Sequence, residues 1–249
     1  MPKFLKFLLF LALIIFAAFT IPSFLPSSDT PNQNTESVSE SVSETEVTNL
    51  GTVVIDAGHG GLDPGKVGVN DALEKDINLS ITLMLKDLLE TQGFQIVLTR
   101  DSDQIMAALD SKTPKKDDMI ARANLIQETN PIFTISIHQN SFPEPSVSGP
   151  QVFYYTNSTE GKLLADTIQA SLNEQLTPKK ERVSQFNDAY FLLKNTPTPI
   201  VIVECGFLSN ADEANLLIQE SYQQKVAHAI YDGILSYYES SLSIPESSE

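Results

Sequence analysis

Two histidines stand where β-prone segments end, and a pair of imidazoles at such positions is suited to binding a metal ion. Residues 53–55 lead through a short glycine-rich turn to His59, and residues 132–137 lead directly into His138. Parallel strands gather their carboxyl ends at one edge of a sheet, so we expect the two rings to converge there. Either ring alone is better explained by backbone hydrogen bonds, but two at equivalent places favour a metal site. The third histidine, His228, lies within an expected helix and is interpreted as an ordinary surface or half-buried residue.

Glu74 offers a third ligand to such a metal. It stands at the expected start of a helix, three residues after Asp71, and this spacing is close to a capping box. The residues alone leave both interpretations open, because a capping carboxylate and a metal ligand would compete for the same oxygen atoms. Two histidines, one glutamate and an open position are typical of catalytic zinc sites, whereas structural zinc sites are closed and rich in cysteine.

Glu204 is the candidate general base. It ends the apolar run 200–203, where burial of a carboxylate is costly unless the group is paired or bound. At the same sheet edge it would accept a proton from a water activated at the metal. The alternative is a structural ion pair with Arg122 or Arg182. The neighbouring Cys205 is interpreted as a small buried residue rather than a nucleophile, because no basic residue adjoins it.

Strands and helices that alternate along the chain are expected to position these residues. The β-prone runs predict strands at 52–56, 94–99, 132–137, 151–155, 190–193 and 200–205. Apolar residues at helical spacing predict helices at 74–91, 117–128, 158–176, 212–219 and 222–238, with a short helix near 104–109. The alternation predicts a single α/β domain with a mostly parallel sheet flanked by helices.

Both ends of the chain differ in composition from the domain expected at 50–238. Residues 1–26 join a basic start to an apolar run, which is the pattern of a signal peptide or a membrane anchor. Residues 27–49 are acidic and rich in Ser and Thr, and we expect a disordered linker there. Residues 239–249 are interpreted as a disordered tail. The leader predicts an exported protein, located in the cell wall or at the outer face of the membrane.

The charge and the cysteine content exclude several classes of function. Sixteen Lys and Arg stand against 32 Asp and Glu, for a formal net charge of −16. This balance argues against nucleic acid as a partner, because phosphate neutralisation dominates such binding. The single cysteine excludes an internal disulfide framework and a multi-cysteine metal site.

Four sequence blocks together resemble the zinc-dependent N-acetylmuramoyl-L-alanine amidases, which are bacterial cell-wall hydrolases. The blocks are Val-Ile-Asp-Ala-Gly-His59-Gly-Gly-x-Asp-Pro-Gly, Glu74-Lys-Asp-x-Asn, Ser-Ile-His138-x-Asn and Glu204-x-Gly-Phe-Leu-Ser-Asn. The resemblance covers about residues 51–238 and implies a six-stranded sheet. It also implies that His59, Glu74 and His138 bind Zn²⁺ and that Glu204 is the catalytic glutamate. The chain looks like the small single-domain members, which include those acting on spore cortex.

The resemblance implies hydrolysis of the amide between N-acetylmuramic acid and L-alanine in peptidoglycan. No long insertion separates the second expected helix from the last strand, where some relatives carry a helix that blocks the site. Control is therefore expected from location, from an activator or from a wall-targeting protein. The alternatives are a zinc carboxypeptidase acting on stem peptides and a non-catalytic exported adaptor that binds peptidoglycan. The presence of all four site residues argues against the adaptor.

Overall fold

The computed structural model describes residues 49–108 and 110–242, which lie in one compact unit, Glu46–Glu249. The expected signal peptide or anchor at 1–26 lies outside the described residues, as does the expected linker up to residue 48. Within the described ranges, no helix combines the length and the apolar character that a membrane span requires.

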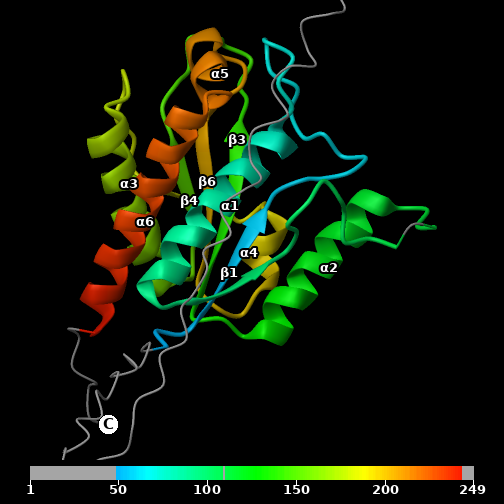
Figure 1. Ribbon diagram of the computed structural model, residues 1–249, viewed down its shortest axis with the longest axis vertical. Helices are drawn as coiled ribbons and strands as arrows, with labels where there is room; N and C mark the ends of the chain where they lie inside the picture. The colour runs from blue at the N-terminus through cyan, green and yellow to red at the C-terminus, as the bar shows by residue number, and fades with distance from the viewer. Residues whose placement is uncertain (1–48, 109, 243–249) are drawn as a thin grey trace, which may run out of the picture. The chain divides into compact units, whose positions relative to one another are not determined.

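One six-stranded sheet organises the described part of the chain, with the strand order β2-β1-β3-β6-β4-β5 (Figure 1). Its strands are β1 (Thr52–Ala57), β2 (Gln95–Leu98), β3 (Phe133–Asn140), β4 (Gln151–Tyr154), β5 (Gln185–Phe186) and β6 (Ile200–Phe207). The four strands β2, β1, β3 and β6 run parallel, β4 pairs antiparallel with β6, and β5 pairs parallel with β4. The predicted single α/β domain with a mostly parallel sheet of about six strands is confirmed.

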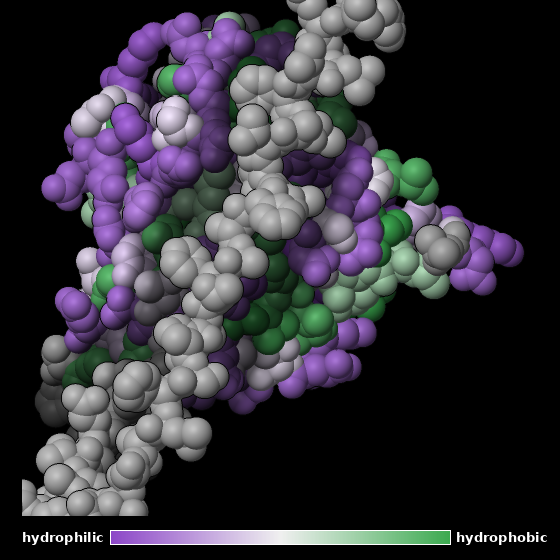
Figure 2. All heavy atoms as spheres, in the orientation of Figure 1, coloured by the Kyte–Doolittle hydropathy of each residue, from purple (hydrophilic) through white to green (hydrophobic). Residues whose placement is uncertain are grey.

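Helices cover both faces of this sheet (Figure 1). They are α1 (Glu74–Gln92), α2 (Pro114–Thr129), α3 (Thr159–Leu176), α4 (Phe191–Asn195), α5 (Ala211–Leu217) and α6 (Glu220–Leu242). Helices α1, α6 and α3 pack side by side on one face, which we call the large face. Helices α2 and α4 cover the other, which we call the small face. Figure 2 shows mainly hydrophilic residues at the upper left of this view and hydrophobic residues toward its centre and right.

Alternation along each strand assigns side chains to one face or the other, because successive residues of a strand point to opposite sides. In β1, Val53 and Ile55 belong to the apolar cluster of the large face, whereas Val54 belongs to that of the small face. In β6, Val203 lies in the large-face cluster and Ile202 in the small-face cluster. The same alternation places Asp56, His138 and Glu204 on the small face, because each follows a strand residue of the large-face cluster.

The expected strand at 190–193 is wrong, because these residues belong to the start of α4. Leu192 and Leu193 are 2% and 1% exposed, and both pack in the small-face cluster. A strand would point these neighbours to opposite sides, whereas one turn of helix buries both on one side. The edge position in the sheet is taken instead by Gln185 and Phe186 of β5, within a polar segment that carries no strand pattern.

Other helices and strands begin or end at residues that differ from the prediction, and some of these differences affect the site. The short helix expected near 104–109 does not form in its described residues, 104–108, and the amide of Met106 donates to Asp118 of α2 instead. Strands β3 and β6 run further than expected, to Asn140 and Phe207, so that His138 lies within a strand rather than just beyond it, whereas Glu204 lies within its strand as expected. At the other end of the domain, α6 continues to Leu242, so residues 239–242 are helical and the predicted start of the tail at residue 239 is wrong. The rest of that tail, 243–249, lies outside the described residues.

Candidate active site

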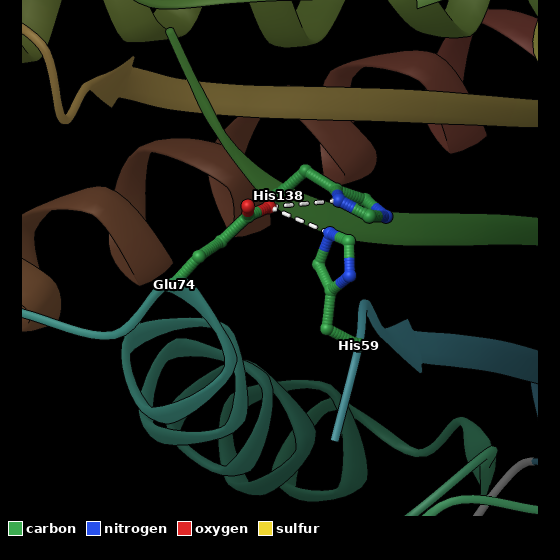
Figure 3. A group of neighbouring side chains, drawn as sticks. All are labelled: His59, Glu74 and His138. Carbon is green, nitrogen blue, oxygen red and sulfur yellow. Dashed lines mark hydrogen bonds and ion pairs between the residues drawn. The ribbon is translucent and has the colours of Figure 1, made fainter. Parts of the chain in front are cut away.

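Two histidines and a glutamate come together at the carboxyl end of the parallel strands (Figure 3). His59 lies just after β1, Glu74 is the first residue of α1 and His138 lies near the end of β3. One carboxylate oxygen, Oε1 of Glu74, lies 3.2 Å from Nε2 of His59 and 3.0 Å from Nδ1 of His138. One donor atom from each residue lies within 4.8 Å of the others. The predicted convergence of the two imidazoles at one sheet edge is therefore confirmed.

Glu74 is directed into this cluster by the backbone around it. The capping-box interpretation is wrong, because Leu73 occupies the N-cap position and no side-chain hydrogen bond caps this end of the helix. Oε2 accepts the backbone N–H of Lys66 at 2.7 Å, and Oε1 accepts the backbone N–H of Gln139 at 3.1 Å. Burial alone would raise the pKa of Glu74, but hydrogen bonds and charge from the two histidines hold it well below its usual range.

His59 is oriented by a carboxylate on its far side. Its Nδ1 lies 2.8 Å from Oδ2 of Asp63, and Oδ1 of Asp63 lies 2.6 Å from Nζ of Lys115 in α2. A hydrogen bond from Nδ1 to the carboxylate leaves Nε2 free to face Glu74, as in many metal sites where a carboxylate fixes the histidine tautomer. Burial lowers the pKa of His59, but Glu74 and Asp63 outweigh it and raise the pKa to about 9. The sequence interpretation missed Asp63, which belongs to the Gly-x-Asp-Pro-Gly block.

Glu204 lies beside His138 because the two residues are partners in the register between β3 and β6. Its side chain is 6% exposed, and burial is the largest cause that raises its pKa to about 7. The hydroxyl of Tyr190 donates to Oε1 at 3.2 Å, whereas buried Oε2 has no hydrogen-bond partner within the described ranges. A carboxylate with one free oxygen and a pKa near neutrality is suited to accept and return a proton.

The alternative of a structural ion pair for Glu204 is wrong. Arg122 pairs instead with Asp56 at 2.6 Å and with Asp118 at 2.7 Å. Nε of Arg182 donates to the carbonyl oxygen of Ser148 at 2.9 Å.

A buried polar network supports the small face next to the site. Asp56 and Arg122 are almost completely buried, and Ser136 donates to the second oxygen of Asp56 at 2.5 Å. Arg122 also donates to the carbonyl oxygens of Ala57 and His59 at 2.7 Å, so it fixes the turn that carries the histidine. Burial would raise the pKa of Asp56, but Arg122 outweighs it, with help from neighbouring groups, and lowers the pKa to about 2.

A cleft of about 380 Å³ opens over these residues. The His-Glu-His cluster and Glu204 form one part of its lining, and the other part includes Tyr190, Phe191, Leu192 and Met119. The cleft therefore places a hydrolytic set of side chains next to apolar and aromatic surface. Buried Cys205 is absent from this lining, and burial raises the pKa of its thiol, which agrees with an inert structural cysteine.

The donor set fits a metal ion. Two imidazole nitrogens and one carboxylate oxygen form a ligand set that zinc accepts in catalytic sites, and the cleft leaves a further position open to a small molecule. His228 lies exposed on α6, outside this cluster, in agreement with its expected surface role. The fold and the site together are those of a hydrolytic enzyme of the α/β class.

Comparisons with known proteins give the family. A family model described as N-acetylmuramoyl-L-alanine amidase matches residues 53–236. The germination-specific N-acetylmuramoyl-L-alanine amidase of Bacillus subtilis is 38% identical over 189 residues, which are 75% of this chain and 79% of that protein. The chain therefore belongs to the family of N-acetylmuramoyl-L-alanine amidases and is an enzyme of that class, as its four sequence blocks predict.

Solved structures of the family share the fold. The CwlD amidase from Clostridioides difficile, solved in complex with the GerS lipoprotein, matches with a TM-score of 0.74 and 37% identity, over 76% of this chain and 99% of that one. The amidase AmiC2 of Nostoc punctiforme matches with a TM-score of 0.68 and 31% identity, over 77% of this chain and 98% of that one. The match includes nearly the full length of both solved chains, so the similarity extends over the whole catalytic fold.

Proposed function

We propose that this protein hydrolyses the amide bond between N-acetylmuramic acid and L-alanine in peptidoglycan, with zinc held by His59, Glu74 and His138. One observation carries the metal assignment: three donor atoms from separate parts of the chain lie within 4.8 Å of one another beside a cleft. The family supports the choice of bond, and the ligand set supports the choice of zinc.

The protein side chains divide the chemistry between them. Zinc, when bound, supplies a Lewis acid that polarises the amide carbonyl and lowers the pKa of a water molecule. Glu204 accepts a proton from the attacking water and returns it to the nitrogen of the departing L-alanine. Its burial supports this role, because burial raises the pKa of Glu204 and so favours a carboxylate that takes up a proton. Asp63 keeps the His59 ring in place through the bond to Nδ1.

We further propose that the enzyme works outside the cytoplasmic membrane, on the cell wall or the spore cortex. The apolar leader in the sequence supports export, and the similarity to a germination-specific amidase supports the cortex. The similarity to an amidase solved in complex with a lipoprotein supports a protein partner that controls or places the enzyme. Cleavage or retention of the leader would decide whether the enzyme is released or anchored.

The test incubates the purified full chain with peptidoglycan and follows the products by mass spectrometry. We expect stem peptides with a free L-alanine amine, and we expect a zinc chelator to stop their release and added Zn²⁺ to restore it. Products shortened at the carboxyl end of the stem would instead indicate a carboxypeptidase. Binding to peptidoglycan without turnover by the zinc-loaded protein would indicate an adaptor. Vegetative wall and spore cortex, compared as substrates, would test the proposed location.

A further inference from the structure

Tyr190 contacts the candidate general base within the cleft. Its hydroxyl donates to Oε1 of Glu204 at 3.2 Å, and both residues line the same cleft. This bond is the only hydrogen bond that the Glu204 side chain makes within residues 49–108 and 110–242, because Oε2 has no partner there. The two carboxylate oxygens are therefore inequivalent: Oε1 accepts a hydrogen bond, and Oε2 is buried without one.

Tyr190 is itself held firmly in place. It is the N-cap residue of α4, where its carbonyl oxygen accepts the backbone N–H of Lys194 at 3.3 Å. Its own backbone N–H donates to Oδ1 of Asn187 at 3.2 Å. Its ring meets that of Phe153 edge to face, with the centroids 5.6 Å apart. A hydroxyl fixed by its backbone and by its ring is a rigid donor, in contrast to one on a mobile loop.

We propose that Tyr190 is a positioning residue for Glu204, and that its hydrogen bond to Oε1 fixes the orientation in which the carboxylate takes part in proton transfer during hydrolysis. The terminal torsion of a glutamate is broad, so a free carboxylate would sample many orientations. One hydrogen bond to a rigid donor restricts that torsion and keeps the carboxylate in one orientation. This inference rests on the proposed function, because it concerns the proton transfer assigned to Glu204.

The proton balance leaves Tyr190 unchanged. A proton moves from water to the carboxylate of Glu204 and then to the nitrogen of L-alanine, and the phenol keeps its own proton throughout. Burial and the charge of Glu204 raise the pKa of Tyr190 above its usual range, which agrees with a phenol that stays protonated. Tyr190 thus acts through Glu204 rather than on the substrate.

The first test compares the steady-state kinetics of the full chain with those of Tyr190→Phe, which removes only the hydroxyl. We expect kcat to fall about tenfold, with KM and zinc content unchanged, because the loss affects the proton transfer and not substrate binding. Tyr155→Phe is the matched control, since Tyr155 packs in the same small-face cluster and its hydroxyl has no hydrogen bond in the described part of the chain. An unchanged kcat, or a raised KM at constant kcat, would overturn the positioning role.

A second test needs no activity. In a double-mutant cycle on the melting temperature of the metal-free protein, Tyr190→Phe is made with Glu204 present and again with Glu204→Ala. We expect the effect of Tyr190→Phe to differ between the two backgrounds, because the hydroxyl has lost its acceptor in the second. Equal effects would overturn the contact. If the wild type lacks amidase activity, the proposed function fails, whereas an active wild type with unaltered Tyr190→Phe kinetics overturns only the role of Tyr190.

Discussion

The two faces of the sheet differ in the side chains that are buried on them. The large face, under α1, α6 and α3, is a continuous apolar cluster that includes Ile55, Leu85 and Ile135, each 0% exposed. The small face, under α2 and α4, has a shorter apolar cluster and a buried ionic network around Arg122. His138 and Glu204 line the cleft from the strands on the small face, and Glu74 reaches the same cleft from the first residue of α1, a helix of the large face. The difference indicates that the large face mainly supplies stability, and that the small face gives up apolar burial to hold charged side chains in place.

The uneven cover of the small face explains where the cleft lies. Helix α4 has only five residues, so together with α2 it does not close over the carboxyl ends of β3 and β6. Side chains at these strand ends therefore meet a cleft rather than a helix. This division of the molecule can be tested face by face, with changes that affect chemistry, stability or metal binding separately.

The largest effect is expected from Glu204→Ala. Loss of the general base should lower the amidase rate by about 10²–10⁴-fold, with the zinc content and the melting temperature near those of the wild type. The measurement is product release from peptidoglycan alongside metal analysis, with Glu160→Ala on the exposed surface of α3 as control. Full activity in Glu204→Ala would contradict both the assignment of the base and the view that the small face carries the chemistry.

Arg122→Ala tests the ionic network of the small face. The change leaves Asp56 buried without its cation, and breaking such a pair costs about 3–5 kcal/mol of unfolding free energy. Chemical denaturation measures the loss. Arg182→Ala, which removes a guanidinium that donates to a backbone carbonyl, is the matched control and should cost far less. Equal costs for the two variants would show that the network contributes no special stability.

Leu85→Ala makes the corresponding test on the large face. Leu85 is fully buried in the apolar cluster, and its truncation should cost about 2–5 kcal/mol through lost burial and an internal cavity. The rate per folded molecule should stay unchanged at a temperature where the variant remains folded. A specific loss of catalytic rate would contradict the separation of the two faces, because it would couple the large-face core to the site.

Asp63→Asn sharpens the comparison inside the small face. The amide cannot accept the Nδ1 proton of His59 as strongly as the carboxylate does, and loss of such a supporting contact lowers metal affinity by about 10–100-fold. Competition with a zinc indicator measures the affinity. Asp103→Asn is a useful control, since Asp103 accepts from Lys75 and Gly61 nearby but does not contact a histidine. Unchanged affinity in Asp63→Asn would contradict the orienting role of Asp63.

The smallest expected effect is a gradual loss of unfolding free energy as the pH becomes acidic. The pKa of Asp56 is about 2 in the folded protein and 3.8 without its partners, so its contribution is present above about pH 4 and is lost as the pH falls toward 2. Unfolding free energies measured across this window should fall more steeply for the wild type than for Asp56→Asn. Parallel curves would show that Asp56 has the same pKa in the folded and unfolded chain.

The sequence predicted those site residues whose positions follow from local sequence patterns. His59, His138 and Glu204 each follow or end a β-prone run, and parallel strands bring such ends together wherever the sheet forms. The choice between metal ligand and helix cap for Glu74 was not decidable from its own segment, and only the resemblance to the amidase family favoured the ligand. In the structure, the amides of Lys66 and Gln139 hold the Glu74 carboxylate in the cluster.

The interactions that sequence reasoning missed depend on distant partners. The pairing of Arg122 with Asp56, and the contact of Tyr190 with Glu204, join residues from separate elements. Tyr190 was also hidden by a wrong strand prediction, since a short run of β-prone residues fits a strand or a helical turn equally well until its packing is known.

The sequence by itself determined the α/β fold class, the amidase family and three of the candidate site residues, His59, His138 and Glu204. These depend on local periodicity and on short motifs, which survive without knowledge of packing. Only the tertiary structure decided which arginine pairs with which aspartate, which oxygen of Glu204 stays free and which face of the sheet opens into a cleft. The physical reason is that burial, and the hydrogen bonds and charges that compensate for it, are properties of neighbours in space rather than neighbours in the chain.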